Sequence, residues 1–182
     1  MKNEFLQNFL QDLKVELMEE FDRNFERKAF FDQKWPGTKF NNPRGSVMMR
    51  SGALRKSLRG TVQGNSIRFY SSLAYAAIHN DGGQITVTDK MKKYFWAMYI
   101  KATGAIRYNV KTRSAVYDAR GQRLSKEAAF WKAMALKKVG SKITIEKRQF
   151  IGPHREVYQI VERLLNSNMK EFEQSITKFL KK

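Results

Sequence analysis

Apolar residues recur every four positions along the first part of the chain, from residue 3 to residue 28. They are Phe5, Phe9, Leu13, Leu17, Phe21 and Phe25. Because an α-helix has 3.6 residues per turn, this spacing places them on one helical face. Neither Gly nor Pro interrupts the run, so the pattern predicts one long amphipathic helix over 3–28.

Residues 32–50 contain several turn-forming residues. Pro, Gly and Asn cluster at 35–37 and 41–45 and predict a long loop over 32–50. A short helix is expected over 52–58, with Ser51 as its N-cap. Two strands, 59–62 and 67–71, then flank a Gly-Asn pair that suits a tight hairpin turn.

Shorter helical and strand patterns fill the rest of the chain. The expected segments are a helix over 74–79, a strand over 84–87, a helix over 89–101 capped by Thr88 or Asp89, a mobile loop or extended hairpin over 103–124, a helix over 125–139 capped by Ser125, a strand over 142–147, and a final helix after Pro153 with a weak break near 166–168. Long helices therefore bracket a few short strands. This order predicts an α+β fold, in which a small antiparallel sheet, a hairpin plus added strands, is packed by long N- and C-terminal helices.

The length of 182 residues suits a single domain over 1–182, with residues 103–140 as a basic insertion or arm within it. No secretory signal is recognisable, and no apolar run approaches the roughly 18 residues that a membrane span needs. We therefore expect no membrane partner.

Charge is strongly unequal along the chain. The sequence has 35 basic and 17 acidic residues, a formal net charge of +18. Residues 1–28 hold five basic and seven acidic groups, whereas residues 103–140 hold nine basic groups and two acidic ones. An acidic first helix is thus followed by a basic remainder, which implies an acidic partner such as nucleic acid or an acidic protein face.

Basic residues alternate with Tyr and Trp between residues 90 and 138. This mixture suggests nucleic-acid contact, because cations meet phosphates while aromatic rings stack on bases. The candidate contacts are Lys92, Lys93, Arg107, Lys111, Arg113, Arg120 and Arg123. Two simpler readings remain open: the aromatic residues belong to the core and the cations are solvated, or the cations face an acidic protein surface.

Residues that support catalysis or metal binding are scarce. The chain has no Cys, which excludes disulfides and thiol catalysis, and only two His residues. His79 with Asp81 falls short of the three or four ligands of a metal site, so His79 is expected to be structural and His154 to cap a helix. No catalytic motif occurs. We therefore expect no enzyme, no metal and no cofactor.

Two segments together resemble the phage virion morphogenesis (tail-completion) family. Residues 51–58 read Ser-Gly-Ala-Leu-Arg-Lys-Ser-Leu, and residues 75–83 read Tyr-Ala-Ala-Ile-His-Asn-Asp-Gly-Gly after a predicted hairpin. Members of that family carry small-Gly-x-Leu-Arg-x-Ser-Leu/Ile, a hairpin, and then Tyr-Ala-x-Ile-His-x-x-Gly-Gly. Residues 35–36 and 148–152 are also similar to it. The matching residues are Gly52, Leu54, Arg55, Ser57, Tyr75, Ala76, Ile78, His79, Gly82, Gly83, Phe150 and Gly152. Residues 103–140 are longer than the family pattern.

The matching residues are explicable as determinants of the fold. We expect Leu54 and Leu58, four residues apart, to be buried, and Arg55 to point outward near a carboxylate or a backbone carbonyl. Tyr75, Ile78 and His79 are expected on one helical face against the hairpin, and Gly82 and Gly83 are expected at a chain reversal.

The resemblance implies a non-enzymatic structural protein of a phage or prophage virion, made in the bacterial host cytoplasm. It would act in tail completion or head–tail joining as a ring-forming homo-oligomer that contacts other tail or connector proteins. The acidic first helix of one subunit would dock on the basic part of the next. A basic nucleic-acid-binding accessory protein that uses residues 90–140 is the alternative.

Overall fold

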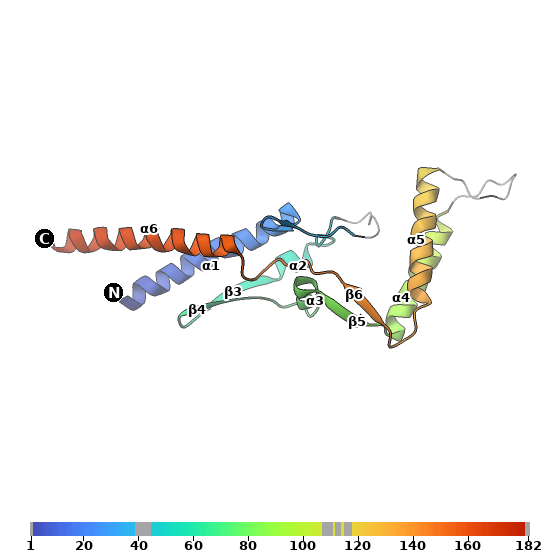
Figure 1. Cartoon of the computed structure of the whole chain (residues 1–182), viewed down its shortest axis with the longest axis horizontal. Helices are drawn as coiled ribbons and strands as arrows, with labels where there is room; N and C mark the ends of the chain where they lie inside the picture. Colours follow the sequence, from blue (N-terminus) through green and yellow to red (C-terminus); the bar gives the residue numbers. More distant parts are fainter. Residues whose placement is uncertain (1, 39–44, 107–110, 112–113, 115–117, 181–182) are drawn as a thin grey trace. The chain divides into compact units, whose positions relative to one another are not determined.

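The computed structural model describes residues 2–38, 45–106, 111, 114 and 118–180 (Figure 1). The chain divides into two compact units. The first, here called the body, comprises Met1–Gly82 and Glu146–Lys182. The second, here called the helical unit, comprises Gly83–Ile145.

The body is built on α1 (Lys2–Arg27), a helix of 26 residues without a break. Its apolar stripe is buried, and its most deeply buried residues are Phe21 and Phe25. The predicted continuous helix over 3–28 is thus confirmed. The stripe stabilises the helix through packing, because propensity alone contributes little to a helix in water.

After α1, two short strands, β1 (Ala29–Phe30) and β2 (Gln33–Lys34), are joined by a tight turn. Lys28, between α1 and β1, and Phe31, in the β1–β2 turn, have positive φ angles of 56° and 53°. Such angles are unfavourable for these residue types. The loop predicted from residue 32 therefore begins later, and part of that loop, residues 39–44, lies outside the described residues.

A short helix, α2 (Ala53–Lys56), leads into the hairpin of β3 (Leu58–Gln63) and β4 (Ser66–Ser71). The two strands pair antiparallel from Leu58 opposite Ser71 to Gln63 opposite Ser66, which confirms the predicted hairpin. Gly52, with φ +71°, occupies the N-cap position that was expected for Ser51. The Ser51 hydroxyl instead accepts a hydrogen bond from the Ala53 amide at 3.3 Å.

The body is completed by α3 (Ala76–Asp81) and the long α6 (Arg155–Leu180). Helix α6 lies along α1 (Figure 1), and Phe5 of α1 meets Phe172 of α6 with ring centroids 5.0 Å apart. The break expected near 166–168 does not occur. The segment contains no Gly or Pro, and the side chain of Asn168 donates to the Leu164 carbonyl within the helix at 3.0 Å.

The helical unit pairs β5 (Gly83–Thr86) with β6 (Lys142–Ile145) in an antiparallel ladder. Between them, α4 (Asp89–Gly104) and α5 (Ala119–Ala135) run antiparallel side by side (Figure 1). Their interface contains small buried residues and the rings of Phe95 and Trp131, which stack at 6.0 Å.

Helix α5 begins earlier than its sequence pattern suggests. We expected a loop until residue 124 and a cap at Ser125, but the side chain of Asp118 caps the helix by accepting from the Gly121 amide at 2.6 Å. The expected end at residue 139 is also wrong, since the helix stops at Ala135. Local pattern missed this start because the first turn of α5 is polar.

The described strands form three separate two-stranded antiparallel sheets, β1–β2, β3–β4 and β5–β6. With long helices at both ends of the chain, the predicted α+β fold is confirmed. The added strands β5 and β6 pair with each other rather than extending the β3–β4 hairpin. Of the helices described, none combines the length and the apolar character that crossing a membrane requires.

Candidate functional site

Arg55 anchors α2 to the acidic side of α1. Its Nε atom donates to Asp22 Oδ1 at 2.5 Å, its Nη2 atom donates to Asp22 Oδ2, and the same Nη2 atom lies 2.7 Å from Glu26 Oε1. The two carboxylates stand four residues apart on α1 and so share one face. These bonds raise the pKa of Arg55 further above its already high value. The expectation that Arg55 lies near a carboxylate is confirmed.

The other residues of the first motif support the α2–β3 turn. Leu54 and Leu58 are buried, as expected. The Ser57 hydroxyl donates to the Leu54 carbonyl at 2.7 Å and lies 2.7 Å from the hydroxyl of Ser71 on the paired strand. Ser57 therefore ties the helix end to the hairpin.

The second motif divides between interior and surface. Ala76 is buried, while Ile78 and His79 are half-buried. Tyr75, however, is 44% exposed and meets the ring of His79 edge-on at 5.9 Å. Tyr75 stands just before α3 and lies beside His79, as expected, but nearly half of its surface is exposed; its packing against the hairpin stays a prediction.

Two asparagines hold the backbone of Phe150, which is itself fully buried. Asn80 Oδ1 accepts from the amides of Phe150 and Ile151 at 3.0 and 3.1 Å. Asn24, at 0% exposure, accepts from the Phe31 amide at 2.9 Å and donates to the Phe150 carbonyl at 3.4 Å. We call Asn24, Asn80 and Phe150 the asparagine junction. It joins α1, α3 and the segment that precedes α6.

Neither asparagine of this junction was predicted from the sequence. For Asn24 a signal was present, since it lies three residues after Phe21 and one before Phe25 within the apolar stripe of α1. A polar residue in such a stripe is expected to be buried and to need hydrogen-bond partners. Asn80 has no comparable signal, because its partners are backbone groups about 70 residues away.

The segment around Trp35 is attached to the same region. The Trp35 indole donates to the Gln149 carbonyl at 2.6 Å. Arg148 donates to the carbonyls of Pro36 and Gly37 at 2.9 and 3.1 Å. Residues 35–37 and 148–150, far apart in sequence, therefore form one hydrogen-bonded unit within the body.

Gly82 ends α3 with φ +73°. A Cβ atom at this position would lie 3.0 Å from the Lys147 backbone nitrogen, so both the angle and the close approach favour glycine. The helix therefore ends at Gly82, and a reversal of the chain there stays a prediction. Gly83 follows as the first residue of β5, and Gly152, with φ +132°, lies in the turn before α6.

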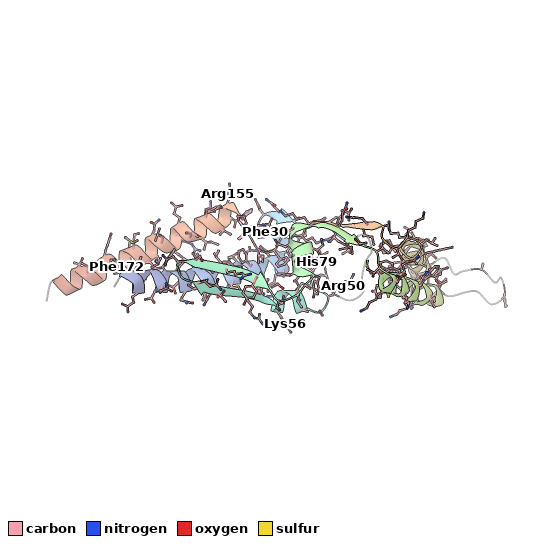
Figure 2. All side chains as sticks on the ribbon, turned by 90° about the horizontal axis from the view of Figure 1, so that it is seen from below. Phe30, Arg50, Lys56, His79, Arg155 and Phe172 are labelled. Atoms are coloured by element: carbon pink, nitrogen blue, oxygen red, sulfur yellow. The ribbon has the colours of Figure 1, made fainter. Side chains whose placement is uncertain are left out.

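His79 lies in an unfavourable place for a positive charge. Burial lowers its pKa, and the neighbouring cations Arg148 and Arg50 lower it further; Figure 2 shows Arg50 near His79. Within the described part of the chain, the buried His79 Nδ1 atom has no hydrogen-bond partner. We infer that His79 is neutral in the folded body at neutral pH.

This environment predicts a loss of stability in mild acid. Because the folded pKa of His79 is lowered, the unfolded chain takes up the proton first as pH falls below about 6.5. The free energy of unfolding should therefore be greatest above that pH and decline toward pH 5. His79→Gln, which cannot take up this proton, should flatten the decline in urea titrations at pH 7.5, 6.0 and 5.0. An equally steep decline in the variant would contradict the assignment.

His154 has the capping role that was expected of it. Its Nδ1 atom accepts from the Glu156 amide at 3.3 Å at the start of α6. Its Nε2 atom lies 3.0 Å from Asp32 Oδ1, and its ring stacks on Phe31 at 4.6 Å. His154 thus links α6 to the β1–β2 turn.

The described residues contain no group of three or more His, Cys, Asp or Glu that could hold a metal ion. One cleft of the body, of about 390 Å³, is lined mostly by apolar residues, among them Leu17, Phe21 and Phe69. A second, of about 330 Å³, lies among charged residues of α1 and α6. Neither cleft is lined by Arg55, Tyr75 or His79.

The candidate nucleic-acid contacts are spread along the helical unit. Lys93 is exposed and Lys92 half-buried near the start of α4, while Arg120 and Arg123 are exposed near the start of α5. Because the two helices are antiparallel, these pairs lie toward opposite ends of the helix pair. Lys111 is exposed, and Arg107 and Arg113 lie outside the described residues.

The carboxylates of α1 are mostly engaged within the body. Asp22 and Glu26 bind Arg55, Glu16 binds Arg163, and Glu19 and Glu20 bind Arg23. The acidic helix therefore has fewer free charges for a neighbouring subunit than its sequence suggests.

Comparisons with models of known protein families, with curated proteins and with solved structures found no match.

Proposed function

We propose that this chain is a non-enzymatic structural protein of phage or prophage virion assembly, which acts in tail completion or head–tail joining as a ring-forming subunit. The observation that carries the proposal is the use made of the motif residues in the body. Gly52 and Gly82 form backbone turns, Leu54, Ala76 and Phe150 are buried, and Arg55 anchors a helix. Such residues support a scaffold.

Exposed apolar side chains supply a further argument, for contact between copies. Tyr158, Leu165, Met169 and Ile176 of α6 are 65%, 40%, 41% and 40% exposed. Their spacing of seven, four and seven residues places them on one face of the helix. Exposed apolar residues that gather on one helical face suggest a contact surface. In this proposal the α6 face contacts a second copy in the ring, and Tyr75 adds a further exposed contact.

Oligomerisation should depend on this α6 face. In sedimentation velocity at high protein concentration and low salt, the chain should form species that are multiples of 21.3 kDa. Leu165→Lys with Met169→Lys should shift the protein to monomer, because two charges would be buried at the contact. Asn166→Lys with Ser167→Lys, which adds the same charge to exposed polar positions of α6, should leave assembly unchanged. A wild-type chain that is monomeric throughout would oppose ring formation by this protein alone.

The place in assembly is tested in the phage or prophage that encodes the chain. Disruption of the gene should yield separate heads and tails, or tails of aberrant ends, in negative-stain electron micrographs. Complementation with the intact gene should restore joined particles, and complementation with the Leu165→Lys, Met169→Lys variant should not. Normal virions from the disrupted strain would refute the proposal.

A further inference from the structure

The two units differ sharply in how their charges are satisfied. The helical unit holds fourteen basic and three acidic residues, a net charge of +11 in 63 residues. The body holds 21 basic and 14 acidic residues, a net charge of +7. Most of the charge surplus of the protein thus belongs to the smaller unit.

Most of the cations described in the helical unit are not engaged by a carboxylate. Among the residues described there, eleven basic side chains take part in no ion pair: Lys90, Lys92, Lys93, Lys101, Arg120, Arg123, Lys126, Lys132, Lys137, Lys138 and Lys142. All the ion pairs given above lie in the body. Unpaired cations at this density repel one another, and binding of an anionic partner relieves the repulsion.

The acidic α1 of a second copy is a poor source of that counter-charge. Five of the seven carboxylates in residues 1–28 already bind arginines of the body. To neutralise the helical unit they would first have to leave these partners. The counter-charge is therefore better supplied by another polyanion.

Exposed aromatic rings indicate which polyanion. Tyr94 and Trp96 of α4 are 51% and 38% exposed. Each stands within one helical turn of a lysine, since Lys90 precedes Tyr94 by four residues and Lys93 precedes Trp96 by three. Cations beside exposed rings suit nucleic acid, in which phosphates alternate with bases that stack on aromatic side chains. An acidic protein surface would make no comparable use of the rings.

We propose that the helical unit binds single-stranded nucleic acid, with the lysines and arginines of α4 and α5 contacting phosphates and with the exposed ring of Trp96 stacking on a base; the Tyr94 ring instead meets Trp131 of α5 edge-on at 5.9 Å. The cations extend along both helices, so the bound strand follows the length of the helix pair. This activity is independent of ring formation and goes beyond the structural role proposed above.

Fluorescence anisotropy of labelled 30-nucleotide DNA, with the full chain between 50 and 300 mM NaCl, tests the proposal. The single strand should bind, and its affinity should fall steeply with salt. Lys93→Glu with Arg123→Glu and Lys126→Glu should weaken binding at least tenfold and reduce the salt slope by about 2, since each phosphate contact contributes about 0.7 for single strands.

Two matched controls separate a site from general charge. Lys34→Glu with Lys56→Glu and Arg155→Glu makes the same charge change at exposed positions of the body and should alter affinity less than threefold. Trp96→Ala should weaken single-strand binding about tenfold, whereas Ile100→Ala, an exposed apolar position of the same helix, should change it less than twofold. Circular dichroism should show every variant folded.

Several outcomes would overturn the inference. They are the absence of binding at 50 mM NaCl, an equal loss in the body variant, and duplex DNA bound in preference to the single strand with no effect of Trp96→Ala. Poly-glutamate that displaces the strand at equal charge concentration would assign the surface to an acidic protein instead.

Discussion

Phe150→Ala is expected to lower the free energy of unfolding of the body by about 3 to 5 kcal/mol, the usual range for removing a buried Phe side chain. The ring of Phe150 is fully buried and meets the ring of Phe25 at a centroid distance of 5.4 Å. Its removal takes apolar surface out of the core and leaves a cavity beside α1. Urea denaturation monitored by circular dichroism measures the loss.

Two further variants show whether the effect comes from packing. Phe150→Leu keeps most of the apolar volume and should cost only about 1 kcal/mol. Tyr75→Ala changes another aromatic residue of the motif, but one that is 44% exposed, and should cost less than about 1 kcal/mol. If Tyr75→Ala destabilised the protein as much as Phe150→Ala, Tyr75 would belong to the core and could not serve as a contact for a neighbouring subunit.

Asn24→Leu is expected to cost about 2 to 5 kcal/mol, although it places an apolar side chain of similar size in a buried position. The Phe31 amide and the Phe150 carbonyl would each lose the partner that Asn24 provides. A buried backbone group without a partner costs about 1 to 3 kcal/mol. The turn at Phe31 adds to the cost, because its φ angle of 53° is unfavourable without that hydrogen bond. The measurement is the urea midpoint at pH 7.

Asn24→Asp tests the same site through pH. The carboxylate would be buried, which raises its folded pKa above the unfolded value of about 3.9. The folded variant would then bind more protons than the unfolded chain, so its deficit relative to wild type should shrink as pH falls from 7 toward 4. As a control for Asn24→Leu, the same change at an exposed position of α6, Asn166→Leu, should change the free energy of unfolding by less than about 0.5 kcal/mol. A pH-independent deficit for Asn24→Asp would show that the side chain reaches solvent.

The substitutions at Phe150 and Asn24 also test the proposed function. Phe150 and Asn24 belong to the asparagine junction, which joins α1, α3 and the segment before α6. If the motif serves as architecture, its buried members should affect stability first and assembly only as a consequence. Substitutions on the exposed α6 face, such as Leu165→Lys with Met169→Lys, should abolish assembly and leave the urea midpoint unchanged.

Local pattern was sufficient for elements whose partners are close in sequence or whose apolar stripe is long. The stripe of α1 predicted a continuous helix, because burial of one face every 3.6 residues decides its conformation. The alternation along β4 and the turn at Gly64 predicted the hairpin, and the unequal charge of the chain was evident from residue counts alone.

Tertiary structure decided which residues meet across long separations. Three sets of contacts join residues at least 29 positions apart. Strand β5 pairs with β6, Asn24 and Asn80 form hydrogen bonds with the Phe150 backbone, and Arg55 and Arg163 bind carboxylates of α1. Periodicity reports which face of an element is buried but not what covers that face, because the covering partner depends on the whole fold. For the same reason, the sequence could determine that the protein is strongly cationic, while only the structure could show that the body pairs many of its charges and that eleven cations described in the helical unit take part in no ion pair.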